Sequence, residues 1–263
     1  MLIQSIQRAL GIMNLFTIAT PRLGLTEISH TLGIHKATTQ GLVRTLLSEG
    51  YLEQDPDTKK YCLGLKIYEL GVVLAGSLEI NQKAVDPAHR LSLDTQLMVR
   101  VCLLDGWEGI TTLDVYPRTQ PFLVRQLGVR FPLYCTAMGK ALLAFLTPKE
   151  IEEYLDQVEF FSFTPKTVLN KDDLLKELEQ VRRLGYSINR EEHLQARAAI
   201  GAPIFNANCR PVASTSLVGD PKRILGKELD SLAKKIVSMA IEVSQSMGFY
   251  PFPFRAAVHN RQG

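Results

Sequence analysis

Small, hydrogen-bonding and cationic side chains recur at helical spacing shortly after residue 35. A helix here would bury an apolar face made at positions i, i+3, i+4 and i+7 by Thr39, Leu42, Val43 and Leu46. Its opposite face would carry Ala37, Thr38, Gln40, Gly41 and Arg44 and no large apolar group. Amide and guanidinium groups pair with base edges, so this face has the chemistry to read a DNA major groove.

The sequence gives little support for a catalytic site. Cys135 and the five histidines form no triad-like pattern, so we interpret Cys135 as a packed small residue. Gly139-Lys140 is not a phosphate loop, because Tyr134 stands where that loop needs its first glycine. We expect no catalytic site and no enzyme activity.

Two further groups of polar residues are predicted to have no role in binding or catalysis. The paired acids Glu191 and Glu192 are predicted to form a solvated turn, and His193 beside them is predicted to lie on the surface rather than in a pocket. The four cysteines are far apart and lack metal-ligand spacing, so we expect no metal site and no cofactor.

The elements around the first face predict a winged helix-turn-helix domain over residues 1–65. Thr26 is predicted to cap a short helix that Gly33 ends, and a second helix then begins near Lys36. Two short strands, 51–54 and 60–63, flank an Asp-Pro-Asp-Thr turn. The residues expected to contact DNA are Gln4, Arg8, Thr26, Lys36, Ala37, Thr38, Gln40, Gly41, Arg44, Lys59 and Lys60.

The rest of the chain predicts a helix and then a mixed α+β domain. Apolar residues from Leu63 to Leu78 recur at helical spacing, which predicts a linker helix over 66–80 that pairs with its copy in a second subunit or lies on its own C-terminal domain. Helices are predicted at 4–19, 81–96, 136–146, 148–157 and 170–184, and in a final segment with an apolar stripe from Leu225 to Met247. Strands are predicted at 98–104, 110–116, 121–127, 186–190, 198–205 and 211–218, with 128–135 as a loop and a disordered tail over 251–263.

Composition agrees with an ordinary globular protein. The 263 residues are 46% hydrophobic and 22% charged, with a net charge of +3, which is too small to indicate nucleic acid by itself. Scattered cysteines, the lack of a secretory signal and the lack of a long apolar run lead us to expect a cytoplasmic protein with no membrane association.

The chain resembles the IclR family of bacterial transcriptional regulators over nearly its whole length. The resemblance rests on segments in both halves: 3–10 (IQSIQRAL), 25–28 (LTEI), 50–56 (GYLEQDP), 61–65 (YCLGL), 132–144 (PLYCTAMGKALLA), 185–186 (GY), 191–192 (EE) and 202–205 (APIF). It implies a GAF-like effector-binding domain, here 81–250, and a homodimer or homotetramer on DNA. It also implies a small organic acid as effector.

The resemblance further implies a pocket formed by Leu123, Phe131, Ala137, Met138, Asn189, Ala199, Ser216 and Val218, with Arg197 at a position that is usually apolar. Asn189, Ala199 and Val218 depart from the polar anchors that are usual there. Arg197 could bind a carboxylate in their place or could point to solvent. The amides at the start of the predicted 136–146 helix also favour an anion.

We therefore predict a transcriptional regulator, acting as a repressor, that binds a pseudo-palindromic double-stranded operator under the control of a small anionic metabolite. The alternative is a metabolite-binding GAF-like sensor that acts without binding DNA.

Overall fold

The computed structural model describes residues 2–117 and 127–250. Contacts divide the chain into two compact units, Met1–Ser77 and Leu78–Gly263, which we call the N-terminal and C-terminal units. The predicted strand 121–127 with Leu123, and the predicted tail 251–263, lie wholly or mainly outside the described residues.

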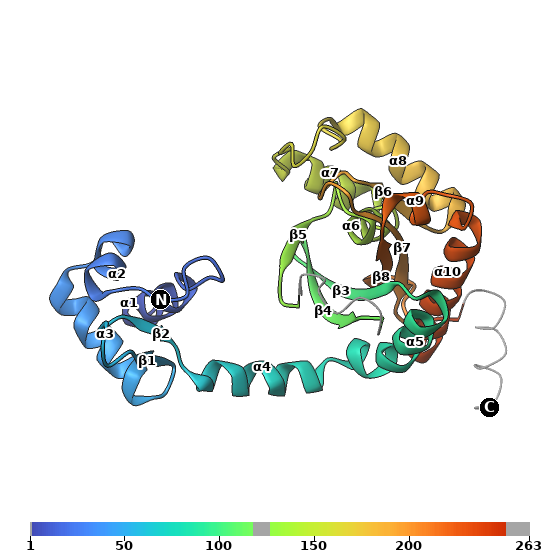
Figure 1. Ribbon diagram of the computed structural model, residues 1–263. Helices are drawn as coiled ribbons and strands as arrows, with labels where there is room; N and C mark the ends of the chain where they lie inside the picture. The colour runs from blue at the N-terminus through green and yellow to red at the C-terminus, as the bar shows by residue number, and fades with distance from the viewer. Residues whose placement is uncertain (1, 118–126, 251–263) are drawn as a thin grey trace, which may run out of the picture. The chain divides into compact units, whose positions relative to one another are not determined.

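The N-terminal unit is a helix-turn-helix followed by a two-stranded hairpin and one further helix (Figure 1). Its elements are α1 (Gln4–Asn14), α2 (Leu25–Leu32), α3 (Lys36–Ser48), β1 (Leu52–Gln54), β2 (Tyr61–Leu63) and α4 (Leu65–Ser77). A small core joins the elements from α1 to β2 through the buried side chains of Ile12, Ile28, Val43, Leu46, Leu52 and Tyr61.

Several predicted boundaries in this unit are wrong. The residue before α2 is Gly24 rather than Thr26, and its N–H donates to the Glu27 carboxylate at 2.6 Å. The first helix ends at Asn14 rather than residue 19, because the Thr20 N–H donates to the Thr17 hydroxyl at 3.0 Å and so forms a turn there.

The stripe predicted from Leu63 to Leu78 also spans more than one element. Leu63 belongs to β2, where it pairs with Leu52, and Leu78 is an extended residue that precedes the next helix. The helix between them, α4, has no buried residue.

The C-terminal unit is α+β, as predicted, with one antiparallel six-stranded sheet. Its strands are β3 (Met98–Asp105), β4 (Glu108–Val115), β5 (Arg130–Pro132), β6 (Ser187–Arg190), β7 (Ala198–Phe205) and β8 (Pro211–Gly219), in the order β5-β4-β3-β8-β7-β6. Its helices are α5 (Glu79–Thr95), α6 (Ala137–Leu143), α7 (Pro148–Gln157), α8 (Lys171–Leu184), α9 (Pro221–Ile224) and α10 (Leu229–Ser246).

Helices cover both faces of this sheet (Figure 1). One core contains α5 and α10 residues packed on Val99, Val101 and Leu217, and a second lies on the other face with α6, α7 and α8. Side chains alternate between the two faces along a strand. The residues that precede or follow Val99, Val101 and Leu217 in β3 and β8 therefore point to the opposite face, toward α6.

Three details of the C-terminal unit differ from the sequence prediction. Residues 130–132 of the predicted loop form β5, because they pair with Glu108–Ile110 of β4. The helix predicted over 136–146 is shorter and spans Ala137–Leu143, with Thr136 as its cap. Leu225 lies before α10, since α9 interrupts the predicted apolar stripe.

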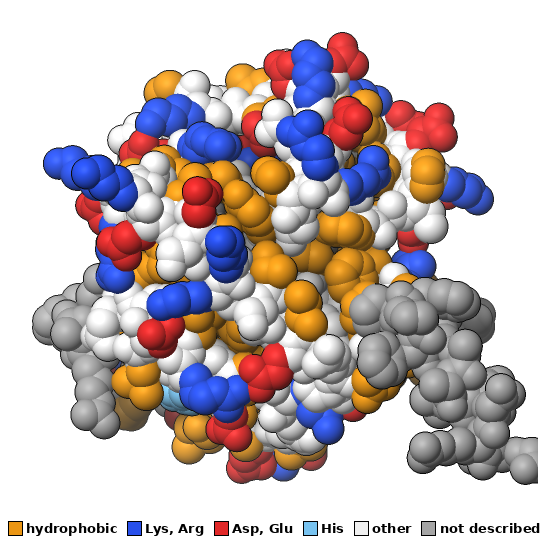
Figure 2. Space-filling model, turned by 90° about the vertical axis from the view of Figure 1, so that its right-hand side faces the viewer, with side chains coloured by type: hydrophobic (Ala, Val, Ile, Leu, Met, Phe, Trp, Pro, Cys, Tyr) orange, Lys and Arg blue, Asp and Glu red, His pale blue; other side chains and the backbone are white. Residues whose placement is uncertain are grey.

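No helix among residues 2–117 and 127–250 is both long and apolar enough to cross a membrane. Figure 2 shows one face of the molecule, on which basic and acidic side chains of described residues are mixed rather than gathered by sign. Such a face does not offer the concentrated positive charge that nucleic acid favours.

Candidate functional site

The exposed face of α3 is the first candidate site. Thr39, Val43 and Leu46 are buried against the rest of the N-terminal unit, as the helical repeat predicts. The predicted contact residues on this helix are all exposed: Lys36, Ala37, Thr38, Gln40, Gly41 and Arg44. His35 makes no side-chain cap to α3, and a methyl group at Gly41 would meet nothing within 4 Å. This face is therefore open to a partner.

The hairpin turn after β1 is organised by one carboxylate. Asp55 Oδ1 accepts hydrogen bonds from the N–H groups of Asp57 at 3.0 Å and Thr58 at 2.9 Å. The Thr58 N–H is the main reason why the pKa of Asp55 falls to about 2. Asp55 also forms an ion pair with Arg22, which ties the turn to the segment before α2.

The two lysines of this hairpin differ in their surroundings. Both are exposed, and Lys59 has a φ of 56°, in the left-handed region. Lys60 Nζ lies 3.8 Å from the Glu27 carboxylate on α2. On α1, Gln4 is exposed and Arg8 is half-buried, while Thr26 is exposed inside α2. Lys59 therefore has the more open position of the two hairpin lysines.

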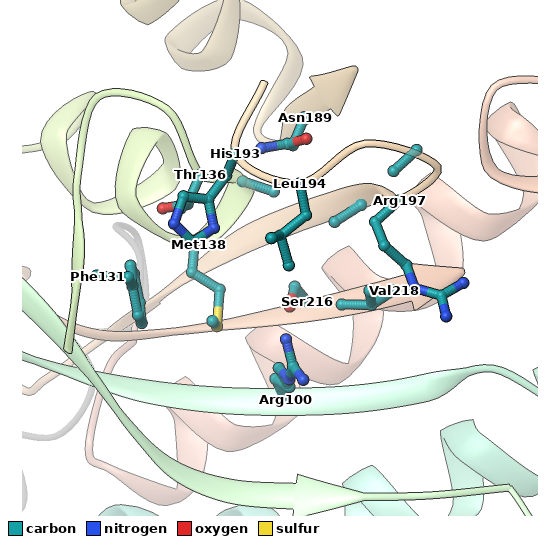
Figure 3. Close-up of a pocket in the computed structure, with 13 residues that line it drawn as sticks. Arg100, Phe131, Thr136, Met138, Asn189, His193, Leu194, Arg197, Ser216 and Val218 are labelled. Atoms are coloured by element: carbon teal, nitrogen blue, oxygen red, sulfur yellow. The ribbon is translucent and has the colours of Figure 1, made fainter. Parts of the chain in front are cut away.

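A pocket with a cavity volume of about 60 Å³ in the C-terminal unit is the second candidate site (Figure 3). It lies between the sheet, the start of α6 and the loop 191–197. It brings together eight predicted effector residues: Phe131, Ala137, Met138, Asn189, Arg197, Ala199, Ser216 and Val218. Arg100, Thr136, His193, Leu194 and Ala198 also line it and were not predicted.

Arg100 is a buried cation in this pocket. The residue is 8% exposed, and its Nε donates to Asp114 Oδ1 at 3.0 Å. The Tyr116 hydroxyl donates to the other Asp114 oxygen at 2.9 Å. The interruption of the apolar run Met98–Val101 by a charged residue is a signal in the sequence that could have identified Arg100.

His193 and Arg197 approach the pocket from the loop 191–197. The prediction that His193 is a surface residue is wrong, because it lines the pocket and its ring lies 4.8 Å from that of Phe163. Burial lowers the pKa of His193, and the charge of Arg100 lowers it further. Arg197 is exposed at the rim, and in Figure 3 its guanidinium lies beside Val218.

The pair Glu191-Glu192 is not a solvated turn. Glu192 is 3% exposed, and both its oxygens accept from Lys140 Nζ, at 2.7 and 2.8 Å. Lys140 is itself 1% exposed and also donates to Glu177 at 2.7 Å. Burial raises the pKa of Glu192, while Lys140 opposes this shift. Glu191 pairs instead with Lys166. These bonds fix one end of the loop that carries His193 and Arg197.

Two buried thiols of the C-terminal unit have raised pKa values. Burial raises the pKa of Cys102 and of Cys135 to about 12, so both remain protonated at neutral pH. Within the described residues, no group of three or more His, Cys, Asp or Glu side chains could hold a metal ion.

Comparison with known proteins matches the two units to two domains that belong to the same protein family. Residues 5–56 match the IclR helix-turn-helix domain, and residues 73–245 match the C-terminal region of the bacterial transcriptional regulator IclR. The HTH-type transcriptional regulator XynR of Escherichia coli is 32% identical over 248 residues, which cover 94% of this chain and 98% of XynR.

Solved structures agree. The crystal structure of the Thermotoga maritima IclR matches with a TM-score of 0.76 and 28% identity, over 93% of this chain and 99% of that one. An IclR homologue from Microbacterium hydrocarbonoxydans, complexed with 4-hydroxybenzoate, has the same fold at 19% identity, with a TM-score of 0.80 over 93% of this chain and 99% of that chain.

Proposed function

Because this chain belongs to the IclR family of bacterial transcriptional regulators, we propose that the exposed face of α3 reads operator DNA and that the pocket of the C-terminal unit binds a small acid that controls this reading. The chain is a DNA-binding transcriptional regulator. The alternative of a sensor that works without DNA is not favoured, since a helix-turn-helix domain of this family matches residues 5–56. We further propose that it acts as a repressor and has no catalytic activity.

The observation that carries the DNA-binding proposal is the α3 face itself, which is exposed and free of large apolar side chains. Gln40 can pair with adenine, and Arg44 can pair with guanine or a phosphate. The Gln40→Ala variant should lose ~1–3 kcal/mol at one operator position and relax specificity there. Selection of binding sites from random DNA tests this assignment, and an unchanged sequence preference would refute it.

The hairpin lysines should act differently, through phosphates. Lys59→Ala and Lys60→Ala should weaken binding to all sequences and lower the salt slope by about one for each contact that is lost. Lys59 should matter more, because Lys60 already lies near Glu27. Lys149→Ala is the matched control, since that lysine is exposed in the C-terminal unit. A loss confined to one sequence would contradict this role.

Exposed apolar surface in the N-terminal unit supports an even-numbered oligomer. Ile3 just before α1, and Ile6 and Leu10 on it, are each at least half exposed. On α4, Tyr68 and Leu74 are 71% and 60% exposed. Apolar patches of this kind mark contact surfaces. A symmetric dimer, alone or within a tetramer, would place two α3 helices on the half-sites of a pseudo-palindrome.

The charge of the pocket lining supports an anionic effector. Arg197 and His193 contribute basic side chains, Arg100 adds a cation that is paired with Asp114, and none of the described residues that line the pocket is Asp or Glu. The α6 helix is too short, at seven residues, for its dipole to be the main attraction. The complex of the related Microbacterium protein with 4-hydroxybenzoate is consistent with an acid as ligand.

Calorimetry with sugar acids and aromatic acids tests the pocket and the role of Arg197. If Arg197 binds the carboxylate, Arg197→Ala should weaken an effector that binds the wild type, whereas equal affinities would show that this arginine points to solvent. The effector can change operator affinity only by its differential affinity for two states of the protein. Operator binding measured with and without it tests that coupling.

A further inference from the structure

A second hollow of the C-terminal unit, which we call the aromatic groove, has a cavity volume of about 440 Å³. Small-molecule sites commonly have a volume of this size. Five aromatic residues line it, from the β3–β4 turn, the segment between β5 and α6, α7 and the loop after α7: Trp107, Tyr134, Tyr154, Phe161 and Phe163. None of its lining residues also lines the pocket to which we assign an acid. The aromatic groove is therefore a separate site.

Two rings of the groove are exposed, although the loop that carries them is held in place. Phe161 and Phe163 are 64% and 40% exposed, and their ring centroids lie 5.0 Å apart in an edge-on pair. The Tyr134 hydroxyl donates to the Phe161 carbonyl and accepts from the Phe161 N–H, both at 2.8 Å. The Phe163 N–H donates to the Thr167 hydroxyl at 3.1 Å. Rings on a loop that is already ordered lose little further freedom when a ligand covers them, which favours binding.

Trp107 contributes the largest ring. It lies in the tight turn between β3 and β4, is half-buried, and its ring centroid is 6.0 Å from that of Tyr154 on α7. The face of an aromatic ring attracts cations, and tryptophan does so more strongly than tyrosine or phenylalanine.

The charged residues that line the aromatic groove are both acidic. Glu108 and Glu159 are exposed, and none of the described lining residues is Lys, Arg or His. Arg130 lies 3.5 Å from Glu108 and offsets part of its charge. Glu159 has no ion-pair partner in the part of the chain that the structure describes. Carboxylates beside aromatic faces repel anions and attract cations, so the lining selects a positively charged ligand.

We propose that the aromatic groove binds a small organic cation, an ammonium compound with an apolar body. Its charged group would lie over the Trp107 ring and near the Glu159 carboxylate, with the apolar body against Phe161 and Phe163. Aromatic faces of this kind recognise quaternary ammonium ligands. The inference goes beyond the proposed function and does not rest on it.

Tryptophan fluorescence of the full chain tests the proposal, because Trp107 is the only tryptophan in the sequence and therefore reports on the aromatic groove. Two matched pairs of compounds replace a cation by an uncharged group of similar size: choline and 3,3-dimethylbutan-1-ol, and phenethylamine and 2-phenylethanol. In at least one pair the cation should bind about tenfold more tightly than the alcohol, as a cation–π contact in a partly desolvated site allows.

Variants studied by calorimetry separate the contributions of the ring and the carboxylate. Trp107→Phe should keep part of the preference for the cation, and Trp107→Ala should bring the cation and the alcohol within about threefold of each other. Glu159→Gln should weaken the cation about threefold and leave the alcohol unchanged. Its matched control is Glu153→Gln, which alters an exposed acid of α7 outside the groove and should change neither affinity. Glu159 is exposed, so this variant keeps the test valid even if the tryptophan variants unfold.

Three results would overturn the cation site. The first is that no cation binds, or that cation and alcohol bind equally well in both pairs. The second is a preference for the cation that survives both Trp107→Ala and Glu159→Gln, which would place the cation elsewhere. The third is Trp107 fluorescence that changes with protein concentration and not with the cation, which would show that a second copy of the chain covers the groove. None of these results bears on the acid pocket, which the titrations with acids test separately.

Discussion

Replacing Lys140 by methionine should destabilise the C-terminal unit by several kcal/mol. The ammonium of this residue donates to both oxygens of Glu192 and to Glu177, and the Lys140 and Glu192 side chains are only 1% and 4% exposed. Methionine fills a similar volume but leaves the Glu192 carboxylate buried without its cation. Removing one partner of a buried ion pair costs about 3–5 kcal/mol.

The lower part of this range is expected, because two features soften the loss. Glu177 is 32% exposed at its side chain and can return to water. Glu192 also keeps the hydrogen bond from the Arg190 N–H at 3.1 Å. We therefore expect a loss of about 3 kcal/mol, measured by urea unfolding followed by circular dichroism at neutral pH.

Two further variants separate charge from packing. Adding Glu192→Gln to Lys140→Met removes the uncompensated charge, so the double variant should recover at least half of the lost stability. Lys149→Met is the control for loss of a lysine, since Lys149 is 85% exposed and 3.7 Å from Glu153, and it should change stability by less than about 0.5 kcal/mol.

The pH dependence gives a check with a definite sign. Burial already raises the pKa of Glu192 above its usual 4.5, and losing Lys140 should raise it further. The folded state of Lys140→Met then binds more protons than the unfolded state, so the destabilisation should shrink as the pH falls toward the unfolded value. A loss below about 1 kcal/mol, or a double variant less stable than the single one, would refute this account.

Three other predictions follow from the structure. Burial lowers the pKa of His193 below 6.5, so the protein should lose stability as the pH falls from about 7.5 to about 5.5, and His193→Gln should flatten this dependence in urea titrations. Gly201→Ala should cost ~1–3 kcal/mol and weaken acid binding, because the new Cβ would meet the Ala137 carbonyl at 2.6 Å and force α6 to shift; an unchanged melting temperature would contradict this packing. The double substitution of Tyr68 and Leu74 by asparagine should lower the molar mass found by light scattering, and an unchanged oligomer would exclude α4 from the interface.

The sequence predicted best what depends on near neighbours. Thr39, Val43 and Leu46 are buried because a helical repeat determines a shared face without reference to distant residues. The hairpin between the predicted strands 98–104 and 110–116 also has a local cause, because Gly106 has the positive φ of 61° that a tight turn requires.

The errors concern residues whose surroundings depend on distant pairing. The burial of Glu192 depends on Lys140, 52 residues earlier, and spacing alone gives no sign of that contact. Arg100 enters the pocket because β3 pairs with both β4 and β8 in one register. Thr26 failed as a cap for a local reason, since the Glu27 carboxylate already accepts from the Gly24 N–H. Resemblance supplied most pocket positions, but not the buried Arg100.

The absence of buried residues in α4 has a consequence for hydrogen exchange. This helix has 13 residues, none of them buried, and it contains Gly71 and Gly76. An isolated helix of this length is marginal in water, and each glycine costs about 1 kcal/mol relative to alanine. Its amide protons should therefore exchange with deuterium rapidly in a lone subunit and slowly once a partner covers it. In deuterated water, the α4 amides of an oligomer would then exchange mainly while a subunit is dissociated. The rate of subunit dissociation would therefore limit how fast these amides take up deuterium.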